Sequence, residues 1–489
     1  MGITTLLVGA GFVIHLAVAA RAITRPNRTP ASRVAWVAVI MALPAIGVIG
    51  YLFLGETSIG HDRVRRLRQA LDSMPPPSQA EPAAVAAVPA WAASSFGVAG
   101  SINGFHPVTG NRMTVLGDPD LPATEPMTDS NIAIDTLIAD IGRAQHTVHL
   151  GFYIWLDDHN GGRVTDAVCE AARRGVTCRV MVDALGSRAF VKSPRWTQLR
   201  DAGVKTVATL NDIPRLGIFP IGRPDLRNHR KIAVIDNTIG YCGSQNCADP
   251  EFRVEAKYAP WIDILLRLEG PVVRQEQYIF LATWIAESGE DVGALVTEEP
   301  APTRHVSGGT ALMSGTGPTD PGNPMSDLFV TTIYAAQRDL TITTPYFVPD
   351  EALLRAVCAA PLRGVRTRIV FPARNNSTLV GATCRSTYGA LLAAGVEVYE
   401  YPLGLLHTKS ITADGELALV GSANMDRRSL QLNFENNLLL ADPAVTAAVL
   451  RRQESYLSVS KRVPSDEAAR WPWHRRLIDN AIGMLSPLL

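Results

Sequence analysis

An H-x-K-x4-D pattern occurs twice in the chain, and each copy is followed by the sequence G-S-x-N. In both copies the glycine lies 14 residues after the histidine, so chance repetition is a poor explanation. The residues concerned are His229, Lys231, Asp236, Ser244 and Asn246 in the first copy and His407, Lys409, Asp414, Ser422 and Asn424 in the second. Histidine can act as a nucleophile or as a general acid and base, and lysine can neutralise negative charge. The pattern therefore points to chemistry on an anionic group.

Phosphoryl transfer is the chemistry that best fits such a pair. Alternate residues of a strand face the same way, so His229 projects with Lys231, and His407 with Lys409. The reaction needs an in-line nucleophile, a proton donor on the leaving oxygen and positive groups around the non-bridging oxygens. Two opposed histidines supply the first two, and the lysines with the asparagines of the G-S-x-N turns supply the third. We therefore expect a site that needs no metal ion.

The two motifs lie near the ends of two similar halves. Beyond about residue 101, helix-like and strand-like patterns alternate, and they do so twice. The segments after Ala144 and Ala336, the pair RRGVTCRVMVD and RGVRTRIVFP, and the pair AGVKTV and AGVEVY repeat at offsets of 192, 190 and 192 residues. We predict an α/β fold of two duplicated lobes in a pseudo-twofold arrangement, the first over 101–310 and the second over 311–460.

The N-terminal region contains two apolar stretches, Ile3 to Ala20 and Val34 to Leu54, without a charged residue. A helix needs about 20 apolar residues to cross the hydrocarbon core of a bilayer. We predict a membrane hairpin over 1–72, with transmembrane helices at about 3–23 and 34–54. A cleaved signal peptide is the alternative for the first stretch, but the positive segment that begins such a peptide is missing.

Two further segments lie outside the lobes. Residues 73–100 are rich in proline and alanine, and we expect a semi-rigid tether there rather than a folded element. Residues 461–489 combine tryptophan, paired arginines and aliphatic side chains, which predicts an amphipathic segment.

Composition and charge exclude several classes of protein. The 489 residues include 46 basic and 46 acidic side chains, so the formal net charge is zero and nucleic acid is not an expected partner. Charged residues make up 19%, below the roughly 25% of ordinary soluble proteins, which favours a part of the chain that does not face water. Six cysteines without paired CxxC motifs indicate neither a disulfide scaffold nor a zinc module.

With these motifs the chain resembles the phospholipase D superfamily, and within it the bacterial cardiolipin synthases that carry two such motifs. The resemblance covers almost the whole chain. Besides the motifs and the hairpin, it rests on PWID from Pro260, TPYFVPDEALL from Thr344 and GSANMDRRSLQLNFE ending at Glu435. One departure is the loop PARNNSTLV, because family members often carry an aspartate near Asn376.

The resemblance implies roles for the two histidines. His229 would be the nucleophile that forms a phosphohistidine, and His407 would protonate the leaving group and later act as the base. Asp263 and Glu435 fall where the family has carboxylates that orient these histidines. We expect Asp263 to hold the ring of His229 and Glu435 to favour the imidazolium of His407, which gives a bell-shaped pH dependence.

The other motif residues are expected to support this pair. Asp236 and Asp414 complete the catalytic motifs, where they would tie each strand to the following turn. The serines and asparagines of the G-S-x-N turns are expected to bind phosphate or to orient other groups; they are Ser244, Ser422, Asn246 and Asn424.

The function implied by the resemblance is phosphatidyl transfer between two phosphatidylglycerol molecules, giving cardiolipin and glycerol without a cofactor. We expect a multi-pass protein of the plasma membrane with its catalytic lobes on the cytoplasmic face. Two alternatives stay open: a membrane-bound phospholipase D, in which water attacks the intermediate, and a non-catalytic membrane scaffold. A scaffold has no physical need for two buried histidine–lysine pairs. Phosphatidylethanolamine or another alcohol could also replace the second substrate.

Overall fold

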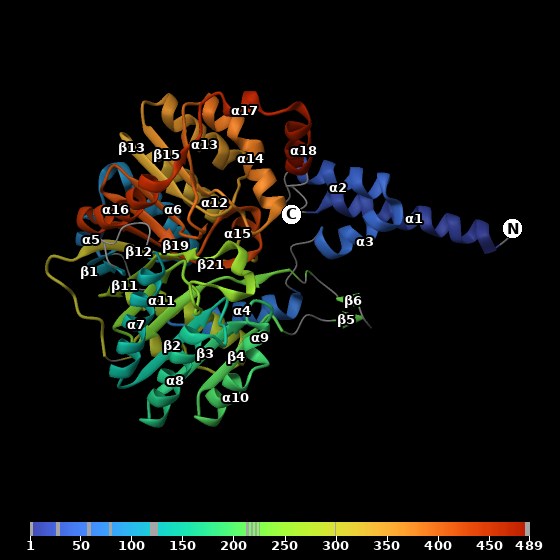
Figure 1. The fold of residues 1–489 in the computed structure, drawn as a ribbon. Helices are drawn as coiled ribbons and strands as arrows, with labels where there is room; N and C mark the ends of the chain where they lie inside the picture. Colours follow the sequence, from blue (N-terminus) through green and yellow to red (C-terminus); the bar gives the residue numbers. More distant parts are fainter. Residues whose placement is uncertain are drawn as a thin grey trace.

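One long β-sheet runs through the middle of the molecule, with helices on both of its faces (Figure 1). A computed structural model describes residues 3–25, 30–55, 60–77, 81–117, 126–211, 215–216, 219–220, 223, 225–298 and 300–484.

The strands of the sheet fall into two matching sets. The first half contributes β1 (Val108–Val115), β2 (Thr147–Phe152), β3 (Thr177–Asp183), β4 (Lys205–Thr209), β8 (Lys231–Ile235), β9 (Ile239–Gly243) and β11 (Leu265–Glu269). The second half contributes β12 (Gly309–Thr316), β13 (Asp339–Thr343), β15 (Arg366–Pro372), β16 (Glu397–Tyr401), β18 (Ser410–Ala413), β19 (Leu417–Gly421) and β21 (Asn433–Ala441). A short strand, β22 (Lys461–Arg462), is added at the outer edge beside β16.

Strand order relates the two halves. The halves meet where β1 pairs antiparallel with β12. Outward from this junction the first half runs β1-β11-β9-β8-β2-β3-β4, and the second runs β12-β21-β19-β18-β13-β15-β16. Each strand thus has a counterpart at the same distance from the centre. The predicted mixed α/β fold of two duplicated lobes is confirmed.

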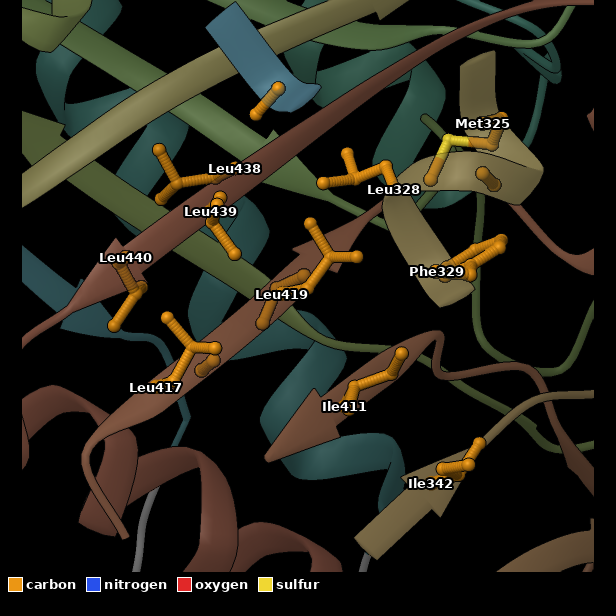
Figure 2. Packing of buried hydrophobic residues seen from close by; sticks show 14 of the residues in the cluster. Met325, Leu328, Phe329, Ile342, Ile411, Leu417, Leu419, Leu438, Leu439 and Leu440 are labelled. Atoms are coloured by element: carbon orange, nitrogen blue, oxygen red, sulfur yellow. The ribbon is translucent and has the colours of Figure 1, made fainter. Parts of the chain in front are cut away.

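Helices cover the sheet and close its hydrophobic core. They include α7 (Pro126–Arg143), α8 (His159–Arg173), α11 (Val272–Ser288), α12 (Pro324–Ala335), α13 (Glu351–Leu362), α14 (Thr378–Ala393) and α16 (Pro443–Val459). In β21, Leu438, Leu439 and Leu440 are all fully buried. Consecutive apolar residues in a strand mean that both of its faces are covered. Figure 2 shows part of this core, in which Leu419 of β19 belongs to the same cluster as Leu328 of α12.

The segment expected to be a tether is instead partly folded. It contains α5 (Pro82–Ala86) and α6 (Ala93–Asn103), and α6 packs against β12 and α12. Phe96 and Ala99 of α6 are buried in the central core. Asn103 exchanges two hydrogen bonds with the main chain of Gly315, at 2.9 and 2.6 Å. The small side chain of Ala99 lets this helix approach the sheet closely, and Phe96 supplies the apolar area that a free tether would leave exposed.

The N-terminal region forms α1 (Ile3–Thr24), α2 (Pro30–Ala42), α3 (Pro44–Leu54) and α4 (His61–Ser73). The second apolar stretch was expected to form one helix but is divided at Leu43. Pro44 has no backbone N–H to continue the first helix and instead occupies the start of the next. Of the helices in the described ranges, none combines the length and the hydropathy that a membrane span requires.

The helices α1 to α3 stand at one side of the molecule, and α1 points away from the sheet (Figure 1). These helices, together with Leu43 between α2 and α3, expose large apolar side chains; within the helices these are Phe12, Val13, Ile14, Leu16, Ile23, Val34, Met41, Ile46, Ile49 and Leu52. By contrast, α4 packs on α11, where the side chain of Arg63 lies 3.3 Å from Glu287.

The amphipathic C-terminal segment contains α18 (Trp473–Met484), which packs on α14. Arg385 of α14 donates a hydrogen bond to Asp479 of α18 at 2.9 Å. The opposite side of α18 exposes Trp473 and Leu477. Residues 485–489 of the predicted segment lie outside the described residues.

Candidate active site

Two short strand pairs cross from one lobe to the other and position the motif histidines. In the first lobe, β7 (Arg227–Asn228) runs parallel to the start of β21 of the second lobe. Likewise β10 (Trp261–Ile262) of the first lobe runs parallel to β17 (Leu405–Leu406) of the second. The residue after β7 is His229 and the residue after β17 is His407. Each motif histidine is therefore tied to a strand of the opposite lobe.

Each histidine is also held by a carboxylate of the opposite lobe. His229 Nδ1 lies 2.9 Å from Glu435 Oε2, and His407 Nδ1 lies 2.7 Å from Asp263 Oδ1. The predicted pairing, Asp263 with His229 and Glu435 with His407, is wrong. The reason is topological, because the crossing strand pairs bring each carboxylate beside the histidine of the other lobe rather than its own.

The serines of the G-S-x-N turns hold these carboxylates. Ser244 Oγ donates to Asp263 Oδ1 at 2.6 Å, and Ser422 Oγ donates to Glu435 Oε2 at 2.5 Å. The turns must approach the carboxylate strands closely, since a Cβ on Gly243 would lie only 2.2 Å from a main-chain carbonyl oxygen. Of the two roles predicted for the serines, their geometry fits the orienting one.

Both histidines line one pocket between the lobes, with a volume of about 200 Å³. An aromatic ring packs beside each of them: the ring centroids of Tyr153 and His229 are 4.8 Å apart, and those of Trp261 and His407 are 4.6 Å apart. Because a carboxylate holds Nδ1 of each imidazole, Nε2 is the atom left to react in the pocket.

The asparagines of the two turns also line the pocket. Asn246 accepts a hydrogen bond from the Ile154 amide through Oδ1, at 3.2 Å. Its amide nitrogen is thereby directed away from that main chain. The side-chain oxygen of Asn424 is buried and has no hydrogen-bond partner among the described residues. Both side chains thus line the same pocket as the two histidines.

The motif lysines lie behind the histidines. Lys231 and Lys409 are 1% and 3% exposed. Each Nζ donates to the carbonyl oxygen of the histidine of its own motif, at 2.7 Å from His229 O and 2.6 Å from His407 O. An ammonium group has three N–H donors, so this contact positions the charge and leaves donors for a ligand.

The motif aspartates lie at the far ends of β8 and β18 from the pocket. Asp236 accepts hydrogen bonds from the amides of residues 145, 146 and 147, at 2.7 to 2.8 Å. Asp414 accepts the equivalent three from residues 337, 338 and 339. Both adopt left-handed backbone, with φ of 49° and 55°, which aspartate tolerates better than most residues. They tie the end of each motif strand to the segment that leads into the neighbouring strand, β2 or β13, and not to the following turn as expected. Their place among the catalytic groups is corrected as well.

Burial dominates the electrostatics of the site. It lowers the pKa of His229 to about 4 and that of His407 to about 3, so both imidazoles are neutral at pH 7 in the empty site. Burial also lowers the pKa of Lys231, to about 8. For Glu435 and Asp263, burial acts to raise the pKa, but the neighbouring histidines and hydrogen bonds outweigh it and hold the pKa of both carboxyls below the usual range.

The resulting charge balance suits an anionic ligand. Burial lowers the pKa of Lys409 well below its usual value, and the charge of a bound anion favours the protonated form of both lysines. A bound phosphodiester would add one negative charge and favour protonation of one imidazole. Within the described ranges, no group of three or more histidine, cysteine, aspartate or glutamate side chains could hold a metal ion.

Several pocket residues were not predicted from the sequence, among them Arg227, Glu255, Asn376, Arg428 and Asn433. Arg428 and Asn433 lie inside the GSANMDRRSLQLNFE segment, which the resemblance had already marked. Glu255 lies in a stretch that the second half lacks, because 17 residues separate Asn246 from Asp263 but only 11 separate Asn424 from Glu435. The repeat could not reveal it.

Comparison with known proteins shows the family to which the chain belongs. A family described as "Cardiolipin synthase, PLD-like domain" matches residues 137–259 and 329–456, and one described as "Phospholipase_D-nuclease N-terminal" matches residues 13–56. Cardiolipin synthase A of Cronobacter sakazakii is 35% identical over 492 residues, covering 99% of this chain and 98% of the relative. Cardiolipin synthase A of Salmonella arizonae is 36% identical over 497 residues, with the same coverage.

A solved structure shares the fold. Phosphatidylserine synthase of Haemophilus influenzae superimposes with a TM-score of 0.54 at 14% identity, over 77% of this chain and 95% of that one. At this identity the similarity concerns the fold alone.

Proposed function

The chain belongs to the cardiolipin synthases of the phospholipase D superfamily, and we propose that it joins two phosphatidylglycerol molecules into cardiolipin and releases glycerol. One observation carries the proposal: His229 and His407 face one pocket, each braced by a carboxylate of the opposite lobe. Two neutral imidazoles with reactive Nε2 atoms suit a double displacement at phosphorus, in which one attacks while the other handles the proton.

In the first step, His229 Nε2 attacks the phosphorus of one phosphatidylglycerol. The bond from phosphorus to the glycerol oxygen breaks, and His407 gives that oxygen its proton. Free glycerol leaves, and the phosphatidyl group stays on His229. Asn246, Asn424 and the two lysines behind the histidines stabilise the charge that builds up on the non-bridging oxygens.

In the second step, the terminal hydroxyl of another phosphatidylglycerol attacks the phosphohistidine. His407 now accepts the hydroxyl proton, the phosphorus–nitrogen bond breaks and His229 returns to its neutral form. One phosphodiester is exchanged for another, so no nucleotide is consumed.

His407 takes up the proton used in the first step from solvent when the substrate binds. Both imidazoles are neutral in the empty site because burial lowers their pKa values. The charge of the phosphodiester raises the pKa of the nearby histidines, so His407 takes up a proton as the lipid binds. This replaces the expectation that Glu435 keeps His407 protonated.

The proposal also covers where the protein lies in the cell. The two N-terminal apolar stretches would anchor the enzyme in the plasma membrane as a multi-pass segment, with the catalytic lobes on the cytoplasmic face. The apolar side chains that α1 to α3 expose support this, since they favour contact with lipid over water. A single cysteine at the exposed Pro76, tested in intact cells with an impermeant thiol reagent, should stay unlabelled. Labelling above that of the parent chain would contradict the cytoplasmic assignment.

The activity is tested by giving the purified full-length protein phosphatidylglycerol and separating the lipid products. Cardiolipin and glycerol in equal amounts are expected, with His229→Ala as the inactive control. Phosphatidic acid as the main product would mean that water is the acceptor and that the enzyme is a phospholipase D. Neither product would favour the scaffold.

A further inference from the structure

The stretch between Asn246 and Asp263 is six residues longer than its counterpart in the second lobe, and it places the acidic side chain of Glu255 on the pocket wall. The same stretch contributes Phe252 and Trp261 to the pocket. Phe252 stacks on Trp261 with ring centroids 3.9 Å apart, and the Trp261 ring packs beside His407. The Glu255 amide donates a hydrogen bond to the carbonyl oxygen of Phe252 at 2.8 Å. Glu255 therefore lies on the same side of the pocket as the aromatic rings that pack beside His407.

A hydrogen-bond chain joins Glu255 to the other lobe. Tyr346 donates from its hydroxyl to Asn376 Oδ1 at 2.8 Å, and Asn376 Nδ2 donates to Glu255 Oε2 at 2.8 Å. The two contacts fix the orientation of the amide, because its oxygen must face the tyrosine and its nitrogen the carboxylate. An ionised aspartate at position 376 could not donate to Glu255, so the chain depends on the amide of Asn376.

The chain keeps unused hydrogen-bonding capacity, and both Glu255 and Asn376 line the pocket. The second carboxylate oxygen of Glu255 has no hydrogen-bond partner among the described residues, and the Asn376 amide has a second N–H. A hydroxyl group can satisfy both, since it donates to the carboxylate and accepts from the amide. An ammonium group can only donate, and a phosphate would be repelled by the carboxylate.

We propose that Glu255 and Asn376 form the subsite that recognises the hydroxyl groups of the glycerol headgroup; this rests on the proposed transfer between phosphatidylglycerol molecules. The subsite lines the same pocket as His407, which handles the proton of the glycerol oxygen in both steps. It thus binds the departing glycerol in the first step and positions the acceptor glycerol in the second. Selection of phosphatidylglycerol over lipids without these hydroxyls follows from the same contacts.

The test compares headgroup release from phosphatidylglycerol with that from phosphatidylpropanol, which has the same phosphodiester but no free hydroxyl. Full-length wild type and Glu255→Gln are assayed in mixed micelles. In the variant, kcat/KM for phosphatidylglycerol should fall about 10- to 100-fold, the range for a lost hydrogen bond to a charged group, while kcat/KM for phosphatidylpropanol stays within about twofold. Asn376→Ala should likewise lower the ratio of kcat/KM for phosphatidylglycerol to kcat/KM for phosphatidylpropanol. The matched control is Glu251→Gln, an exposed glutamate of the same loop, which should leave both values unchanged.

Equal losses on both lipids in Glu255→Gln would overturn the proposal, because the side chain would then only shape the pocket. So would a wild type that does not discriminate between the lipids. A wild type that prefers phosphatidylethanolamine, and loses this preference in Glu255→Gln, would mean that the carboxylate reads an ammonium group instead. Headgroup release is measured whether the acceptor is lipid or water. Failure of the proposed function, seen as missing cardiolipin, is thus separate from failure of the subsite.

Discussion

Replacing Glu435 by glutamine removes one charge from the centre of the site and nearly preserves the shape of the side chain. Glu435 is 0% exposed and lies 2.9 Å from His229 Nδ1. When His229 Nε2 attacks phosphorus, its ring gains positive charge. The carboxylate stabilises that charge across the Nδ1 hydrogen bond, whereas the amide of glutamine offers only a neutral oxygen.

The magnitude follows from the separation of the two groups. Unit charges about 4 Å apart interact by about 4 kcal/mol at an effective dielectric constant of about 20. Each ~1.4 kcal/mol of transition-state stabilisation is worth a factor of ten, so attack by His229 should slow about a thousandfold. Glutamine can still accept from Ser422, and the fold should be retained.

The assay is formation of the covalent adduct from a nitrophenyl phosphodiester lipid, stopped with acid and read by intact-protein mass. Nitrophenolate leaves without a proton, so adduct formation reports on His229 alone. Asp263→Asn is the matched control, because it makes the same change beside His407. The Asp263→Asn variant should form the adduct at a rate within about tenfold of that of wild type. It should transfer the phosphatidyl group from the adduct to the acceptor lipid more slowly, because that transfer needs a base. Slow adduct formation in Asp263→Asn but not in Glu435→Gln would refute the cross-lobe pairing.

Three further predictions concern the lysines, the pH dependence and the motif aspartates. Lys231→Met or Lys409→Met should reduce turnover by about 10²–10³, the size of a lost oxyanion donor, and a thermal melt should show little loss of stability; near-full turnover would mean that the lysines do not act on phosphate. Burial lowers the pKa of both histidines to about 4 or below, so the protonated fraction falls as pH rises, and kcat/KM should decline steadily between about pH 5 and 7.5; a bell-shaped profile centred near pH 7 would contradict this. Asp236→Ala should lower the free energy of unfolding in urea by about 1–3 kcal/mol, since three backbone amides lose their acceptor, without changing the kcat of the folded enzyme.

The sequence predicted the parts of the structure that repeat. Two copies of the motif and three segments at nearly constant offsets indicated two lobes, and the strand order confirms them. Local patterns sufficed there because the signal lies within each segment.

Contacts between distant segments were beyond such patterns. Glu435 is 206 residues from His229 in sequence, and only the crossing of β7 with β21 brings them together. Within each half the carboxylate follows the histidine by about 30 residues, so the sequence favoured pairing each histidine with the carboxylate of its own half. The position of α6 likewise depends on its packing against β12 and α12. The break at Pro44, in contrast, was visible in the sequence, because proline disfavours a continuous helix.

The covalent intermediate provides the most direct test of the two-histidine mechanism. Wild type, His229→Ala and His407→Ala are each given the nitrophenyl phosphodiester lipid, quenched with acid and digested, and the modified peptide is identified by mass spectrometry. We expect the phosphatidyl group on His229 in wild type, its accumulation on His229 in His407→Ala, and no adduct in His229→Ala. An adduct on His407 in the His229→Ala variant would reverse the roles of the two residues. Turnover by wild type without any adduct would mean direct transfer and would contradict the double displacement.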